Sequence, residues 1–302
     1  MHARDRYRDA AAFRRALEQR LRTEAQKSRI PLNRLRKEAA FNRLLVRLSD
    51  VAPTAWALKG GLALIARVGA HVRGTKDADA NWRASLDDLE DALTDIEDAD
   101  VCDWFTFNVG DARPLQGEGD EGALRYPVTA TLDGRVFEQL SLDVNVLSPD
   151  DRRPIELVTV RRNPFDFTGA APLTIPMVTP AQQLAEKLHA YTRTYDDERS
   201  SRAKDLFDML VIADEVALPH GDVLTRTTND TFEVRTTSWP PVLVAPPTDW
   251  AGPWHGFTTE YPLRWDDLDG AFRALERFWR PVFDGTAATT RTTWKPDDWA
   301  WV

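Results

Sequence analysis

The most informative stretch of the sequence spans residues 73–79 and reads Arg73-Gly74-Thr75-Lys76-Asp77-Ala78-Asp79. We predict a β-strand over residues 75–82. Residues two apart on a strand point to the same face, so the side chains of Asp77 and Asp79 project together. Two such carboxylates repel each other unless cations compensate them, and a hard divalent cation with oxygen ligands is their natural partner. The motif predicts a metal site, with a solvated strand end as the alternative in so acidic a chain.

Upstream, Lys59-Gly60-Gly61 stands between a predicted strand at residues 55–58 and a short apolar helix at residues 62–68. Two glycines let the backbone approach a phosphate closely, and a helix N-terminus offers free N–H groups to an anion. A tight strand-to-helix turn explains the same residues without a ligand. The spacing matches neither a Walker A motif nor a dinucleotide-binding fingerprint.

Downstream, the segment 136–147 shows the clearest strand pattern, because Leu142 and Val144 alternate with polar residues at period two. Asp143 lies on the face opposite these apolar residues. It can add a third carboxylate from a neighbouring strand, or it can be an ordinary solvent-facing residue.

Two later helices carry further charged candidates. Lys187 flanks the buried stripe of one helix, where a lysine commonly reaches past apolar neighbours into solvent. Asp205 falls in the first turn of a helix at residues 202–213, where a carboxylate complements the helix dipole. In the same helix, Lys204 and Asp208 have the spacing of an ordinary i,i+4 ion pair.

The remaining pattern predicts an α+β fold in two domains, residues 1–175 and residues 176–302. Thr179 and Pro180 mark a strong helix start, and Gln182 would complete a capping box. The Trp- and Pro-rich region beyond Ser238 predicts an irregular but well-packed lobe. Further helices are expected at residues 9–27, 32–48, 86–96 and 267–278, and further strands at residues 104–109, 124–132 and 155–160.

Charge is distributed unevenly along the chain. Residues 1–48 contain 14 Lys and Arg against 5 Asp and Glu, a net charge of +9 in a chain whose total is −9. Such asymmetry bears on partners rather than on fold. The Arg-rich N-terminal helices therefore predict a polyanionic partner such as RNA, and a pair of solvated helices is the alternative.

Cysteine content and hydropathy limit the cellular setting. Cys102 is the only cysteine, so a disulfide within the chain and a zinc cluster of thiolates are both excluded. We expect a reduced, cytoplasmic environment. We also expect no membrane association, because no run approaches the roughly 18 apolar residues of a membrane span and the N-terminus lacks the apolar core of a signal peptide.

The order of these motifs resembles the nucleotidyltransferase fold, and more narrowly the AbiEii family of nucleotidyltransferase-like toxins, which includes the mycobacterial MenT toxins. The resemblance spans about residues 44–212. It implies a mixed sheet flanked by helices, with a mainly helical C-terminal lobe that completes the active site. The blocks that carry it are Leu58-Lys59-Gly60-Gly61-Leu62-Ala63-Leu64, the stretch at residues 73–79, Glu186-Lys187-Leu188-His189-Ala190 and Arg202-Ala203-Lys204-Asp205-Leu206-Phe207-Asp208.

The resemblance also implies roles for single residues. Asp77 and Asp79 would ligate Mg²⁺ and position the triphosphate of an NTP, and Asp143 would be the third metal-binding carboxylate. Lys187 would contact the nucleotide phosphates, and Asp205 would be a further catalytic acid. Some family members are regulated by modification of a hydroxyl at the position of Thr75. The expected nucleotide-binding residues are Lys59, Gly60, Gly61, Arg73, Thr75 and Lys76.

The activity implied by the resemblance is that of a Mg²⁺-dependent nucleotidyltransferase toxin. Such an enzyme moves NMP from an NTP to an acceptor and releases pyrophosphate. The acceptor expected here is the 3′ end of tRNA, whose modification blocks translation, and a cognate antitoxin is the expected partner. Two alternatives stay open: transfer to a protein or small-molecule hydroxyl, and a catalytically silent binding protein. Retention of both Asp77 and Asp79 argues against the silent protein.

Overall fold

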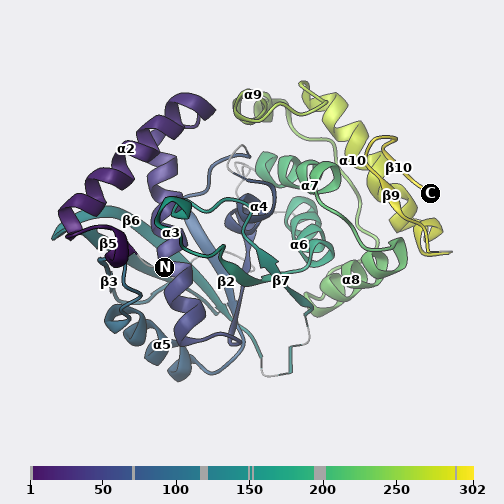
Figure 1. The fold of residues 1–302 in the computed structure, drawn as a ribbon. Coiled ribbons are helices and arrows are strands. Elements are labelled where there is room, and N and C mark those ends of the chain that lie inside the picture. Colours follow the sequence, from purple (N-terminus) through teal and green to yellow (C-terminus); the bar gives the residue numbers. More distant parts are fainter. Residues whose placement is uncertain are drawn as a thin grey trace. The chain divides into compact units, whose positions relative to one another are not determined.

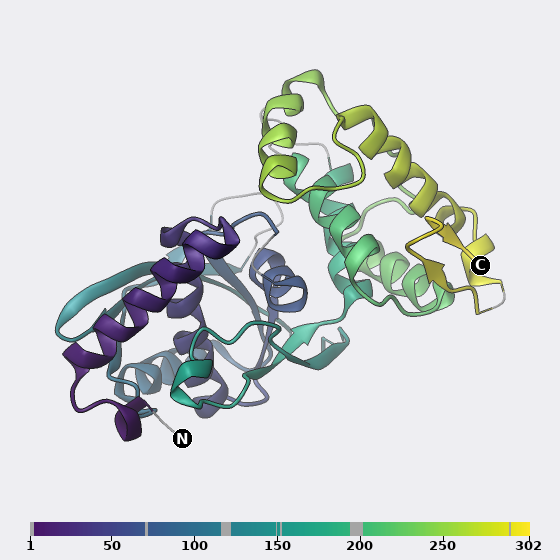
Figure 2. The ribbon, with the colours of Figure 1, turned by 45° about the horizontal axis from the view of Figure 1, so that its top comes forward.

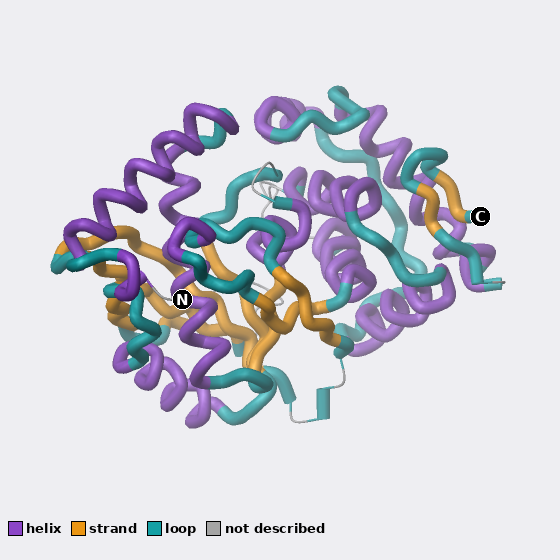
Figure 3. Tube along the Cα trace, viewed as in Figure 1, coloured by secondary structure: helices purple, strands orange, loops and turns teal. Residues whose placement is uncertain are grey.

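The computed structural model describes residues 3–69, 72–115, 122–148, 150–151, 153–193, 202–289 and 291–302 (Figure 1). The described residues form two compact units. The first unit contains the residues up to 69 together with residues 74–177, and the second contains residues 72–73 and 178–302. Strands concentrate in the first unit and helices in the second (Figure 3).

The first unit is built on a mixed sheet. In the described part of the chain this sheet has eight strands, ordered β3-β5-β6-β2-β1-β8-β7, with β4 paired to β5. Strand β2 runs parallel to β6 and β1 parallel to β8, whereas β1–β2, β5–β6 and β3–β5 are antiparallel. The strands are β1 (Trp56–Lys59), β2 (Asp77–Trp82), β3 (Phe105–Val109), β4 (Arg113–Pro114), β5 (Ala123–Leu132), β6 (Arg135–Val146), β7 (Ile155–Thr159) and β8 (Thr174–Val178).

Helices pack on this sheet through apolar stripes. Helix α3 packs against β6 and α5, α4 packs against β1 and β2, and α2 lies alongside α3 (Figures 1 and 2). In α3, Leu35 and Leu44 are fully buried, and burial of one such side chain stabilises the fold by roughly 1.5–3 kcal/mol. The helices are α1 (Ala3–Arg6), α2 (Ala10–Ser28), α3 (Leu32–Val51), α4 (Gly60–Val68) and α5 (Leu86–Asp98), with a 3₁₀ turn at Asp166–Thr168.

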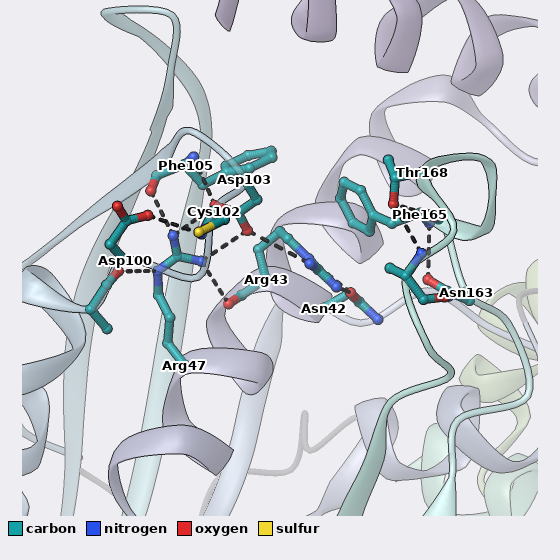
Figure 4. A network of polar contacts seen from close by, with 12 residues as sticks. Asn42, Arg43, Arg47, Asp100, Cys102, Asp103, Phe105, Asn163, Phe165 and Thr168 are labelled. Carbon is teal, nitrogen blue, oxygen red and sulfur yellow. Dashed lines mark hydrogen bonds and ion pairs between the residues drawn. The ribbon is translucent and has the colours of Figure 1, made fainter. Parts of the chain in front are cut away.

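Two arginines of α3 are buried rather than solvated (Figure 4). Arg47 is 1% exposed and donates to both carboxylate oxygens of Asp103, at 3.2 and 2.8 Å. Arg43 lies over the ring of Phe165, 4.1 Å from its centroid, and 3.6 Å from Asp103. Burial, together with the charge of Arg47, lowers the pKa of Arg43 to about 10. The expectation that the Arg-rich helices present their charge to solvent is therefore wrong for these two residues, which hold α3 against the loop before β3.

The second unit is mainly helical, and its C-terminal part packs tryptophans around α10. The indole N–H groups of Trp294, Trp299 and Trp301 donate to the carbonyls of Ala213, Ala274 and Phe278, respectively. The tryptophans are packed as expected, but the region is less irregular than expected, because it contains helices at Ala251–Glu260 and Leu268–Phe283. Its elements are α6 (Pro180–Thr192), α7 (Ala203–Glu215), α8 (Gly221–Val234), α9 (Ala251–Glu260), α10 (Leu268–Phe283), the strands β9 (Trp294–Lys295) and β10 (Ala300–Trp301), and 3₁₀ turns at Thr248–Trp250 and Thr286–Ala288.

The predicted α+β class, with a mixed sheet flanked by helices and a helical C-terminal region, is confirmed. The longer elements that were not predicted are β8, α8 and α9, and the short elements α1, β4, β9 and β10 were not predicted either. One predicted detail differs, because Thr179 caps α6 by accepting from the N–H of Gln182, but the Gln182 side chain donates to Glu186 and Thr231 instead of closing a capping box. Within the described ranges, none of the helices combines the length and apolar character that crossing a membrane requires.

Candidate active site

A row of charged residues crosses four neighbouring strands of the first unit. The register pairs Lys59 of β1 with Asp79 of β2, Asp79 with Asp143 of β6, and Asp143 with Arg125 of β5. Paired residues share a face of the sheet, so the four side chains form one row in which two carboxylates are flanked by two cations. The predicted strands thus bring Asp79 and Asp143 side by side.

Asp77 lies one alternation before Asp79 on the same face. The residues between and after them, Ala78 and Ala80, are buried at 0% and 2% exposure, whereas the Asp77 side chain remains 34% exposed. The hydroxyl of Thr75 donates to the backbone carbonyl of Asp77 at 3.1 Å and so braces the start of the strand. Lys76 is exposed. The expected pairing of the two aspartates on one face of β2 follows directly from this alternation.

The Gly-Gly turn stands directly against Asp79. Gly60 has a φ of +67°, a conformation that disfavours residues with a Cβ, and a Cβ built there would lie 2.0 Å from Asp79 Oδ2. Gly60 also begins α4, whose first N–H groups have no acceptor within the helix. The helix start therefore approaches the Asp79 carboxylate at a distance that only glycine permits.

Asp143 is held by Arg125, a residue that sequence reasoning missed. The Arg125 guanidinium donates to both carboxylate oxygens of Asp143, from Nε at 2.8 Å and from Nη2 at 2.7 Å, and Nη2 lies 3.7 Å from Asp77 Oδ2. The hydrogen bonds and charge of Asp143, with added attraction from Asp77 and Asp79, raise the pKa of Arg125 above its ordinary value. No spacing rule could identify this arginine, because the partnership depends on the register between β5 and β6.

The second unit holds a separate, buried cluster of charges around Lys187. Its Nζ lies 2.9 Å from Asp205 Oδ1 and 2.8 Å from Asp208 Oδ2. Burial alone would lower the pKa of Lys187, but the charges of Asp205 and Asp208 outweigh it and raise the pKa. Lys187 is therefore held as an ammonium ion, and it does not reach past its neighbours into solvent.

Two arginines complete this cluster. Arg73 donates to both oxygens of Asp208, at 2.6 and 2.5 Å, and Arg202 donates to Asp205 at 3.4 Å. Burial by itself raises the pKa of Asp208, yet the charges of Lys187 and Arg73 prevail and lower it. Asp208 therefore pairs with Lys187 and Arg73, not with Lys204 as the i,i+4 spacing suggested. In the described part of the chain, the cluster thus joins Lys187, Arg73 and Arg202 to the carboxylates of Asp205 and Asp208.

The chemistry of the first-unit carboxylates suits Mg²⁺. Proteins usually bind this cation through one or two carboxylates, with substrate phosphates and water filling the other positions. Asp77 and Asp79 meet that requirement as hard oxygen donors on one face. In the described part of the chain, no group of three or more His, Cys, Asp or Glu side chains is gathered as ligands for a metal. The metal role of Asp143 stays a prediction, because Arg125 binds both of its oxygens.

Comparison with known proteins agrees with this arrangement. The family model described as "Nucleotidyl transferase AbiEii toxin, Type IV TA system" matches residues 43–284. The structure is similar to that of MenT4, a nucleotidyltransferase toxin from Mycobacterium tuberculosis, with 20% identity, a TM-score of 0.56, and coverage of 90% of this chain and 99% of that chain. JHP933 from Helicobacter pylori matches with 15% identity, a TM-score of 0.44, and coverage of 85% and 94%.

The likeness to MenT4 confirms the predicted nucleotidyltransferase fold. Among curated proteins, none matches this chain in sequence. The family model spans most of the chain and includes the first-unit carboxylates as well as the Lys187 cluster. The chain belongs to the AbiEii family of nucleotidyltransferase toxins of type IV toxin–antitoxin systems.

Proposed function

We propose that this toxin transfers a nucleoside monophosphate from an NTP to the 3′ end of tRNA, releases pyrophosphate and thereby blocks translation. The observation that carries the proposal is the paired row of Lys59, Asp79, Asp143 and Arg125, with Asp77 on the same face, in a chain of the AbiEii family. A row of this kind offers oxygen ligands for a cation and, beside them, cationic side chains for phosphates.

The proposed reaction is an in-line displacement at the α-phosphorus. The acceptor hydroxyl oxygen forms a bond to this phosphorus while the bond to the bridging oxygen of the β-phosphate breaks. Pyrophosphate leaves with the electron pair, and the hydroxyl proton is released. Mg²⁺, when bound, supplies charge neutralisation at the phosphate oxygens. The chain's own part is to hold that cation with Asp77 and Asp79 and to admit the phosphates beside Gly60.

We assign Lys187 and Asp205 to the same reaction, as the family resemblance implies. Support comes from the position of Lys187 between Asp205 and Asp208, whose charges keep its buried ammonium protonated. Arg73 belongs to this cluster through its bonds to Asp208, and we assign its role in nucleotide binding together with that of Lys187.

A stripe of arginines on α2 supports an RNA acceptor. Arg15 and Arg22 lie seven residues apart on α2, which places them on one face about 10.5 Å apart, and Arg8 and Arg29 stand just before and just after the helix. All four are exposed. We call this set the α2 stripe. Exposed cations in a line favour phosphate backbones, and binding through them weakens as salt rises.

The arginines of α3 contribute less to such a surface. Arg34 pairs with Glu38 at 3.3 Å, and Arg36 donates to Glu18 at 3.2 Å and to the Phe137 carbonyl at 2.6 Å. Their side chains are only 12% and 23% exposed, so they present less charge to solvent than the α2 stripe does, although Arg22 of the stripe shares Glu18 with Arg36. The proposed RNA contact therefore lies on α2 rather than along both N-terminal helices.

Incubation with tRNA and NTPs labelled at the α-phosphate tests the proposal, with γ-labelled NTPs as the matched control. Transfer of α-label but not γ-label to the tRNA 3′ end is expected, and Asp77→Ala should transfer none. A parallel incubation with cell lysate decides the acceptor, because label that follows protein or small molecules instead of RNA would refute tRNA as the substrate. Absence of transfer from every NTP to any acceptor would leave a binding protein on the same scaffold.

The family also implies an antitoxin partner. We propose that regulation can act at Thr75, because its hydroxyl bonds to the backbone of Asp77 at 3.1 Å. Modification of this oxygen would remove that bond and place a new group next to the carboxylates.

A further inference from the structure

Arg125 is the positively charged residue beside Asp143 and Asp77, as Lys59 is beside Asp79. It comes from β5 and binds both oxygens of Asp143 at 2.8 and 2.7 Å, while its Nη2 lies 3.7 Å from Asp77 Oδ2. The guanidinium thus engages both carboxylate oxygens of Asp143 in the bidentate geometry of a strong Arg–carboxylate pair. In this structure the carboxylates are compensated by a side chain of the protein.

The geometry also leaves Arg125 able to move. Its side chain is 41% exposed, whereas that of its main partner Asp143 is 11% exposed. An arginine on a long stem at the surface can exchange a carboxylate partner for water at modest cost, because exposed ion pairs contribute little net stability. The fixed member of the pair is therefore the carboxylate, and the exchangeable member is the guanidinium.

We propose that Arg125 is a built-in counter-cation that competes with the divalent metal ion for Asp143 and Asp77. This inference rests on the proposed function, since it concerns the cation that the reaction uses. Without metal, Arg125 prevents repulsion among Asp77, Asp79 and Asp143. Metal binding favours release of Asp143 by the guanidinium, because the guanidinium occupies one lone pair on each carboxylate oxygen and its positive charge repels a divalent cation bound beside it. Arg125 is a positioning residue in this scheme, and it lowers the affinity for the metal.

A purely structural role makes the opposite prediction. If the pair only fixed β5 against β6, removal of the guanidinium would disorder Asp143 and weaken cation binding or leave it unchanged. If Arg125 competes with the cation, removal strengthens cation binding. The sign of the change therefore separates the two roles.

The experiment measures Mn²⁺ binding to the full-length chain without nucleotide, by electron paramagnetic resonance of the free ion. Arg125→Gln should bind Mn²⁺ about tenfold more tightly than the wild type, a change of about 1.4 kcal/mol. Arg125→Lys keeps the charge and should lie between them. Arg113→Gln is the matched control, because Arg113 is the exposed β4 residue paired with Arg125 and its loss changes the net charge equally. It should change the affinity less than twofold.

Specificity and folding have their own controls. Adding Asp77→Asn to Arg125→Gln should abolish the gain in affinity. Thermal unfolding without metal should show a lower melting temperature for Arg125→Gln, and Mn²⁺ should raise it more than it raises that of the wild type.

Equal or weaker Mn²⁺ binding by Arg125→Gln would overturn the inference, and so would an equal gain in Arg113→Gln or the absence of Mn²⁺ binding in every variant. Failure of this inference and failure of the proposed function can be told apart. A protein that binds Mn²⁺ as expected but transfers no nucleotide would refute only the proposed activity. A protein that transfers nucleotide without a gain in Arg125→Gln would refute only the counter-cation.

Discussion

The two charged clusters of this toxin differ in how their charges are satisfied. In the second unit, Lys187 and Asp208 are buried and make direct bonds of 2.5–2.9 Å with each other and with Arg73 or Asp205. In the first unit, Asp77 and Arg125 keep 34% and 41% of their side chains exposed and approach each other only to 3.7 Å.

This difference separates a cluster that supports the fold from one that can change partners. Removing one member of a buried ion network leaves an uncompensated charge that water cannot reach. Removing one member of a partly exposed row leaves a charge that water or a ligand can still compensate. We therefore expect substitutions in the Lys187 cluster to lower stability strongly, and substitutions in the carboxylate row to affect cation binding and activity first.

The largest expected effect on stability is that of Asp208→Asn. It leaves Lys187 and Arg73 buried with one carboxylate fewer, and breaking a buried pair in this way typically costs about 3–5 kcal/mol. Urea unfolding followed by circular dichroism measures the change. Asp214→Asn is the matched control on the same helix, because Asp214 pairs with Arg264, whose side chain is 40% exposed, and such ion pairs contribute little to stability. An equal decrease in unfolding free energy in both variants would show that the Lys187 cluster stabilises the fold no more than an ordinary ion pair does.

Gly60→Ala should come next, with an effect on activity larger than its effect on folding. Its Cβ would collide with the Asp79 carboxylate, and displacement of a catalytic group by about 1 Å can cost about a hundredfold in rate. Gly134→Ala controls for the strain of a side chain at positive φ, because Gly134 has a φ of +64° and a Cβ there would have nothing within 4 Å. Label transfer per folded molecule is the measurement, and a similar rate in both variants would contradict the close approach seen at Gly60.

The unfolding free energy should also depend on pH through the buried Lys187 cluster, with a smaller change than the substitutions above produce. The pKa of Asp208 is lowered in the folded state, so its stabilisation is complete above the unfolded value near 3.9 and is lost as pH falls through the folded pKa. The pKa of Lys187 is raised, so its stabilisation is complete below the unfolded value near 10.4 and is lost as pH rises through the folded pKa.

Urea titrations at a series of pH values test this. The difference in unfolding free energy between the wild type and Asp208→Asn should be constant from about pH 5 to about pH 9 and shrink in stronger acid. A difference that grows in acid would assign the stabilisation to other groups.

The smallest expected effect concerns the α2 stripe and appears only in salt dependence. Changing Arg15, Arg22 and Arg29 to Gln should lower the slope of log affinity for tRNA against log salt by about two units. Arg34→Gln with Arg36→Gln should leave the slope unchanged, because these side chains are engaged within the first unit. A lower slope in the Arg34→Gln, Arg36→Gln variant, with an unchanged slope in the α2 stripe variant, would place RNA on α3.

Local pattern was sufficient to predict the elements that hold the carboxylates. The alternation around Asp143 and the glycines at residues 60 and 61 predicted strand, turn and helix correctly, because each signal lies within a few residues. Strand β8 was missed because it is buried from Ile175 to Val178 and contains Pro176, so it shows no alternation. Helix α8 was missed because its many threonines favour strands over helices.

The partners of the charged residues could not be predicted from the sequence in the same way. Arg73 and Asp208 are 135 positions apart, and Arg47 and Asp103 are 56 apart, so only the fold reveals these pairs. Charge counting assigned Arg43 and Arg47 to a basic surface, whereas the structure buries them. Composition gives the number of charges but not which of them water reaches.

The most direct test of the central claim is pyrophosphate release with tRNA and NTP, measured for the wild type, Asp77→Asn, Asp79→Asn and the stability control Asp214→Asn. The claim is that the partly exposed carboxylate row carries cation-dependent nucleotidyl transfer. Wild type and Asp214→Asn should release pyrophosphate only when Mg²⁺ is present, and both row variants should release at least about a thousandfold less, as expected when several kcal/mol of transition-state charge stabilisation is lost. Release by folded Asp77→Asn and Asp79→Asn at the wild-type rate would contradict the account.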